Sequence, residues 1–129
     1  MRRAAALVTV VLLLGGCGLV REEKVTHTID YSLTLEGDGA LWGIEFHYRD
    51  NGNRIEERVS LPAWGHRVVV ESPPARVAEV MGQPELREFM RNRPGRPATP
   101  RTTCTIHVDG RKVAENTGTI AHCQALVGQ

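Results

Sequence analysis

Apolar and polar residues alternate along most of this chain beyond residue 24. In residues 25–35 the odd positions carry Val, His, Ile, Tyr and Leu, whereas the even positions carry Thr, Asp and Ser. A period of two places each set of side chains on one face of a strand, so the pattern predicts a half-buried strand. The same alternation returns in residues 42–49, where Trp42, Phe46 and Tyr48 share a side that is typical of a core. The domain is therefore predicted to be all-β.

Turn signals divide the alternating part into about seven short strands. The predicted segments are residues 25–35, 42–49, 54–61, 66–71, 75–81, 103–108, 111–115 and 120–127, and the fifth of these also fits a helical turn. The pair Asn51-Gly52 tolerates positive φ and predicts a hairpin between the second and third strands. Short strands without a long helix predict a two-sheet antiparallel β-sandwich of immunoglobulin-like shape, formed by residues 25–129.

Residues 83–101 depart from the alternation. Four prolines surround residues 85–92, which could form two helical turns, and the whole segment is predicted to be an exposed insertion between strands. Five arginines and two glutamates give the segment a local charge of +3. Guanidinium groups suit phosphate and carboxylate, so anionic headgroups or an acidic partner surface are candidate ligands. The residues in question are Arg87, Arg91, Arg93 and Arg96. The alternative is a solvated loop, and headgroup contact further requires the loop to lie on the tethered side.

Residues 1–17 are typical of a bacterial secretory signal. Two arginines precede an apolar run over residues 4–14, and the sequence Leu-Gly-Gly-Cys ends at Cys17. This ending resembles the lipobox of bacterial lipoproteins, in which the cysteine is lipidated and becomes the first residue of the mature protein. We therefore expect a signal or anchor helix before the domain and a lipid anchor on Cys17.

If Cys17 carries a lipid anchor, residues 18–24 form a short linker. The domain then lies on the extracytoplasmic side of the bacterial plasma membrane. Two alternatives stay open. Residues 4–20 carry no charge, so an uncleaved transmembrane helix is one of them. A soluble secreted form is the other.

Beyond the predicted anchor, the only cysteines are Cys104 and Cys123. In an oxidising compartment an even pair predicts a disulfide. A zinc site is the main rival, because His107 and His122 lie near the two thiols in the sequence. Residues that are three apart, or adjacent, point to opposite faces of a strand, so only the cysteines would meet. We expect a cystine and no metal.

Composition and local motifs argue against several functional classes. The balance of 16 basic and 15 acidic residues does not suit a general nucleic-acid binder or a disordered polyelectrolyte. None of the three serines, Ser32, Ser60 and Ser72, lies in a Gly-x-Ser-x-Gly turn, so a hydrolase is not expected. Residues 50–53 could begin a calcium loop, but such a loop would lack the glycine at its sixth position and the glutamate at its twelfth, so they are interpreted as a hairpin turn. No catalytic residue and no cofactor is predicted.

The C-terminal part of the chain carries a family resemblance. The run CTIHVDGRKV begins at Cys104 and is followed by a glycine-containing loop and Cys123. It resembles the signature of the MmpS family, in which Cys-x-Ile-x-Val-(Asp/Asn)-Gly precedes a second cysteine near the C-terminus. Upstream, the aromatic strand ending at Tyr48, Leu61-Pro62 before a tryptophan, and Pro74-Ala75 are similar to the family's order of elements. The chain differs from typical members in its lipobox and its long segment 83–101.

MmpS proteins are small membrane-anchored accessory proteins with an extracytoplasmic β-sandwich. They work with MmpL transporters of the RND superfamily in exporting lipids or siderophores. The resemblance therefore implies a non-catalytic accessory protein whose partner is an MmpL-like transporter. The alternative is a free-standing envelope lipoprotein that binds a small amphipathic ligand between its sheets.

Overall fold

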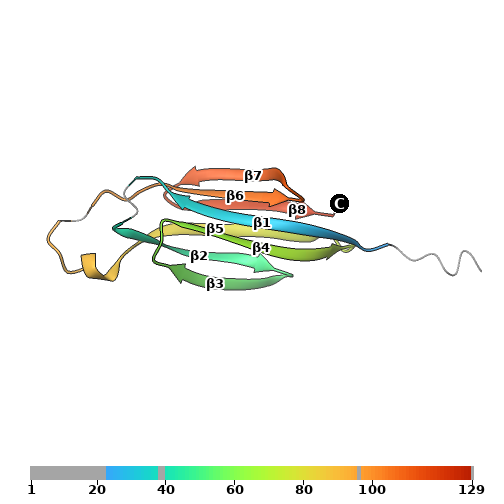
Figure 1. The fold of residues 1–129 in the computed structure, drawn as a ribbon, viewed down its shortest axis with the longest axis horizontal. Helices are drawn as coiled ribbons and strands as arrows, with labels where there is room; N and C mark the ends of the chain where they lie inside the picture. The colour runs from blue at the N-terminus through green and yellow to red at the C-terminus, as the bar shows by residue number, and fades with distance from the viewer. Residues whose placement is uncertain (1–22, 38–39, 96, 129) are drawn as a thin grey trace, which may run out of the picture.

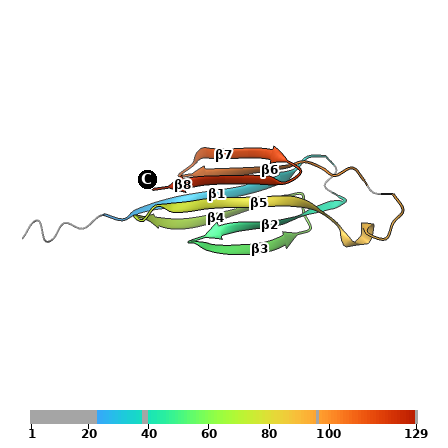
Figure 2. The ribbon, with the colours of Figure 1, turned by 180° about the vertical axis from the view of Figure 1, so that it is seen from behind.

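A computed structural model describes residues 23–37, 40–95 and 97–128. Within them, eight strands form two four-stranded antiparallel sheets that pack against each other (Figures 1 and 2). The strands are β1 (Val25–Leu35), β2 (Trp42–Asp50), β3 (Asn53–Val59), β4 (Ala63–Ser72), β5 (Arg76–Leu86), β6 (Thr102–Val108), β7 (Arg111–Gly118) and β8 (Ala121–Val127). The predicted β-sandwich is confirmed, and each of its eight strands overlaps one of the eight predicted segments, although the expected number was about seven. The predicted signal or anchor helix and Cys17 lie outside the described residues.

Sheet A has the strand order β4-β1-β6-β7, and sheet B has the order β3-β2-β5-β8. The predicted hairpin is confirmed: β2 pairs with β3 around Asn51 and Gly52, whose φ values are 51° and 85°. Asp109 and Gly110, with φ of 51° and 81°, close the hairpin between β6 and β7 in the same way. Asn, Asp and Gly adopt this left-handed region more readily than other residues, which explains their places in the two turns.

The core lies between the sheets and consists of the inward side chains of the alternating strands. Its largest members are Ile29, Tyr31, Leu33, Ile44, Phe46, Tyr48, Val80 and Ile106. Gly82 of β5 allows the two sheets to lie close together, because any Cβ at this position would lie only 2.9 Å from Leu33 Cδ1 of the facing sheet. The Tyr31 hydroxyl donates to the backbone oxygen of Arg49 at 2.8 Å and accepts from Glu79 N at 3.2 Å. Side chains from both sheets thus occupy the interior.

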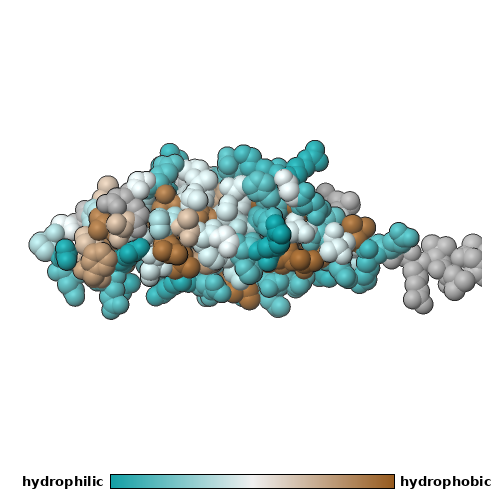
Figure 3. All heavy atoms as spheres, viewed as in Figure 1, coloured by the Kyte–Doolittle hydropathy of each residue, from teal (hydrophilic) through white to brown (hydrophobic). Residues whose placement is uncertain are grey.

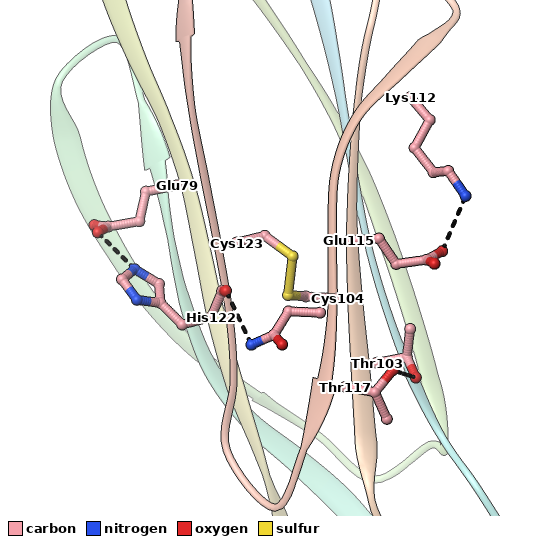
Figure 4. The surroundings of a disulfide bond; sticks show 9 residues. Glu79, Thr103, Cys104, Lys112, Glu115, Thr117, His122 and Cys123 are labelled. Atoms are coloured by element: carbon pink, nitrogen blue, oxygen red, sulfur yellow. Dashed lines mark hydrogen bonds and ion pairs between the residues drawn. A yellow bond between two sulfur atoms is a disulfide. The ribbon is translucent and has the colours of Figure 1, made fainter.

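A disulfide joins the two sheets. Cys104 of β6 and Cys123 of β8 are both buried, and their Cα atoms lie 6.0 Å apart (Figure 4). This confirms the predicted cystine. His122 is adjacent to Cys123, but its side chain points away from the disulfide toward Glu79, as Figure 4 shows. The alternation of a strand therefore separates the imidazole from the sulfur atoms.

The segment 83–101 differs from the prediction at its start. Its first four residues belong to β5, where Trp42 pairs with Leu86 and Ile44 pairs with Pro84. Pro84 is tolerated because β8 ends its pairing at Gly82, so no ladder bond to β8 is lost at the proline. Residues 85 and 86 belong to β5, so the rest of the predicted segment 85–92 is too short for two helical turns. A single 3-10 turn, η1 (Glu88–Met90), is present instead.

The two ends of the sandwich carry different segments. β1 begins at one end, and the loop of residues 87–101 extends from the other (Figures 1 and 2). Among the described residues, no helix combines the length and the apolar character that crossing a membrane requires.

Candidate functional site

The end of the molecule opposite the start of β1 carries the candidate site. We define the tip as residues 60–62 together with the described residues of the loop 87–101. The loop is fastened at both ends: Arg87 N donates to the backbone oxygen of Leu41 at 3.0 Å, and Glu36 N donates to that of Arg101 at 2.9 Å. Arg87 Nη2 also donates to the backbone oxygen of Ser60. The tip is therefore built onto the sandwich by backbone contacts.

Apolar side chains are exposed at the tip. Phe89 and Leu61 keep 52% and 61% of their surfaces accessible to solvent. Figure 3 shows apolar atoms beside hydrophilic ones at this end of the molecule. The Arg93 guanidinium lies 5.7 Å from the centroid of the Phe89 ring, within the range of a cation–π contact. Exposed aromatic groups beside arginine are typical of surfaces that contact other molecules.

A hollow of about 420 Å³ opens beside η1. It is lined by Leu86, Met90, Arg91, Arg93 and Gly95. Two side chains of the lining are apolar and two are guanidinium groups. The hollow can therefore receive a molecule that carries both an apolar part and a negative charge.

Few carboxylates lie close enough to the arginines of the tip to neutralise their positive charge. Arg91 Nη2 lies 3.8 Å from Glu85 Oε1, which is too long for a hydrogen bond. No carboxylate in the described part of the chain lies within ion-pair distance of Arg87, Arg93 or Arg101. The tip thus presents positive charge to solvent.

Of the four arginines predicted as candidates, the structure brings Arg91 and Arg93 together at the hollow, whereas Arg87 is half-buried and its Nη2 donates to the backbone oxygen of Ser60. Arg96 lies outside the described residues. Contact with the headgroups of the predicted membrane requires the loop to lie on the tethered side, and the structure places the loop at the end of the sandwich opposite the start of β1 (Figure 1). A partner or ligand at the tip remains the better interpretation.

A second hollow, of about 600 Å³, lies on the outer face of sheet B, the face turned away from the core. Both arginines of its lining are paired with glutamates of β3, β2 and β5. Arg54 Nη2 lies 3.0 Å from Glu56 Oε1, and Arg58 lies 3.9 Å from Glu45 and 3.4 Å from Glu85. This larger hollow therefore has little net charge to attract a ligand, unlike the tip.

A hydrogen-bonded cluster around Glu79 adjoins that hollow. The Glu79 carboxylate accepts from His122 Nε2 at 2.9 Å and from Arg49 Nε at 3.2 Å. The hydrogen bond from His122 and that from Arg49 hold the pKa of Glu79 below its usual value. His47 lies beside them, where burial and the nearby Arg54 lower the pKa of its imidazole. In the described residues no group of His, Cys, Asp and Glu has an arrangement that could hold a metal ion.

The lowered pKa of His47 predicts a loss of stability in mild acid. The folded protein favours the neutral imidazole, so the unfolded chain takes up a proton first as the pH falls. This contribution is fully present above about pH 6.5, the ordinary histidine pKa, and is lost as the pH falls toward the lower pKa of the folded state. In urea unfolding at pH 7, 6 and 5, His47→Gln should show a shallower fall in unfolding free energy than wild type. Equal slopes would contradict this assignment.

At the end of the sandwich where β1 starts, hydrogen bonds link three side chains, those of Ser72, His27 and Asp109. Their positions in the sequence gave no sign of this contact. His27 Nδ1 donates to Asp109 Oδ2 at 2.8 Å, and His27 Nε2 lies 2.9 Å from Ser72 Oγ. The order Ser–His–Asp is that of a hydrolase triad, but Ser72 is only 4% exposed. Pro73 and Pro74 follow it and supply no backbone N–H for an oxyanion hole. These hydrogen bonds connect β1, β4 and the turn between β6 and β7.

No protein-family model matches the chain, and no curated protein matches it either. The resemblance to the MmpS family therefore stays a prediction based on the residues themselves.

Proposed function

We propose that this chain is a non-catalytic, extracytoplasmic accessory protein of an MmpL/RND-type exporter of lipids or siderophores, held to the plasma membrane by a lipid on Cys17. It would bind the extracytoplasmic region of the transporter, or its cargo, and stabilise a productive assembly. The observation that carries the proposal is the cystine between the sheets of a β-sandwich. It coincides with the segment that resembles the family signature.

The signature segment forms one structural unit. Cys104 lies in β6, the Asp109-Gly110 turn follows, β7 returns beside β6, and β8 supplies Cys123. The disulfide fixes the β6–β7 hairpin of sheet A to β8 of sheet B. A small domain with such a staple is suited to an oxidising compartment outside the cytoplasm.

The arrangement of the two ends supports an adaptor role. The predicted anchor precedes β1, and the tip lies at the other end of the strands (Figure 2). A chain tethered through its N-terminus would hold the tip away from the membrane. The cationic and apolar groups of the tip would then face an extracytoplasmic partner or its cargo.

The alternative of a ligand between the sheets has less support. Aromatic and aliphatic side chains fill the interior, where Phe46 and Trp64 have ring centroids 4.2 Å apart and Tyr31 and Tyr48 have centroids 5.8 Å apart. Both hollows described above lie outside this core. The accessory role is therefore the function that we favour.

Mild crosslinking of intact cells followed by purification of the full chain tests the proposal. We expect an MmpL-like transporter to be enriched over a purification from cells that carry Cys17→Ala, because loss of the anchor would remove the chain from the membrane. A prey list without any RND-type transporter would contradict the proposed function. Finding the transporter equally with both chains would contradict the role of the lipid anchor.

A further inference from the structure

We infer that the tip hollow binds the phosphate head group of an amphipathic molecule, whose hydrocarbon chain lies against Leu86 and Met90. The inference rests on the proposed function, since it names the class of cargo that the tip would hold. The residues that carry it are Arg91 and Arg93, which line the hollow, and Phe89, which lies beside it.

Charge favours a phosphate over a carboxylate. Two guanidinium groups line the hollow. Of the carboxylates in this region, Glu85 is 3.8 Å from Arg91 and is shared with Arg58 at 3.4 Å, and Glu88 of η1 lies within ion-pair distance of neither arginine of the lining. A phosphate monoester carries a charge of about −1.5 to −2 near neutral pH, which matches two cations, and its oxygens accept paired hydrogen bonds from the guanidinium fork. A carboxylate carries one negative charge and would leave one arginine without a counter-ion.

The apolar lining favours an amphiphile over a free phosphate ion. Leu86 and Met90 provide an apolar wall, and methionine adapts its shape to flexible hydrocarbon. The volume of about 420 Å³ lies within the roughly 300–1,000 Å³ that is common for small-molecule sites. Inorganic phosphate would use only the two arginines and leave the apolar wall in contact with water.

The outer face of sheet B supplies a matched control. Arg54 and Arg58 line the hollow there, but both are engaged by glutamates. An anion binding to them would have to displace those carboxylates. Removing these two arginines changes the net charge of the protein by the same amount as removing Arg91 and Arg93.

Native mass spectrometry of the full chain, released from a neutral detergent, measures the binding. Octyl phosphate, octanoate, octyl glucoside and inorganic phosphate are compared at equal concentrations. We expect a 1:1 complex with octyl phosphate that is about tenfold more stable than that with any of the other three. The Arg91→Ala/Arg93→Ala variant should bind octyl phosphate about tenfold more weakly or worse, because two charge-assisted hydrogen-bonding groups are lost. Arg54→Ala/Arg58→Ala should stay within about twofold of wild type.

Several results would overturn the inference. Equal binding of octyl glucoside would show that only the hydrocarbon is recognised, and equal binding of octanoate or inorganic phosphate would remove the proposed selectivity. Equal losses in the two double variants would show a general effect of net charge. Circular dichroism confirms that each variant keeps its β-structure before binding is measured. If octyl phosphate fails to bind while crosslinking still captures the transporter, this inference falls and the proposed function stands.

Discussion

Replacing Cys104 and Cys123 together by alanine is expected to lower the free energy of unfolding by about 3 kcal/mol. The two cysteines are 19 residues apart, so the crosslink removes a substantial part of the freedom of the unfolded chain. It also fixes β6 of sheet A to β8 of sheet B, two strands that are joined in sequence through β7. The loss is large for a domain of this size, where total stability is about 5–15 kcal/mol.

Urea unfolding with and without a reducing agent measures this effect. Wild type should lose the same stability when it is reduced, whereas the double alanine variant should be insensitive to reductant. A change below about 0.5 kcal/mol in both experiments would show that the disulfide contributes little, which the chain-entropy account does not allow.

Gly43→Ala is expected to cost about 2 kcal/mol or more. Gly43 lies in β2, and a Cβ at this position would overlap the backbone oxygen of Val59 and lie 3.1 Å from Ser60 Cα. Backbone cannot swing aside as a side-chain end can, so β3 and its corner would have to shift. The corner includes Ser60, which accepts the hydrogen bond from Arg87, and the change should therefore also loosen the tip.

Gly65→Ala is the matched control for this substitution. Gly65 also lies within a strand, β4, but a Cβ there would be 3.6 Å from the Tyr31 backbone oxygen, an ordinary contact. Alanine lowers the entropy of the unfolded chain, so this variant should be within about 0.5 kcal/mol of wild type or slightly more stable. Equal unfolding free energies for the two variants would contradict the proposed close approach of β2 and β3.

Alternation and turn chemistry were sufficient to predict the fold class. Residues 25–35 were predicted as a strand, and β1 covers these residues. The Asn51-Gly52 turn and the cystine were also found from residue type and spacing alone. These features depend on local geometry or on a unique pairing, so the sequence contains the information directly.

Features that depend on strand order could not be predicted. The line from Ser72 through His27 to Asp109 joins residues 45 and 82 positions apart, and only the pairing of β1 with β4 and β6 brings them together. The sequence predicts the start of the insertion too early, because a proline favours a loop unless the strand that would lose a hydrogen bond there is known to be absent; β8 ends its pairing with β5 at Gly82, before Pro84.

The tip shows the same limit. Its arginines are predicted from residue type, and the lining of the hollow is local to residues 86–95, but the position of the tip opposite the start of β1 follows from the topology.

The intact mass of the protein isolated from cell membranes tests the central claim most directly. A cystine-stapled sandwich held by a lipid should give a chain that begins at Cys17, carries added acyl groups, and is two hydrogens lighter than its fully reduced form. A mass that begins at Met1 without acyl groups, with both remaining thiols free, would contradict it.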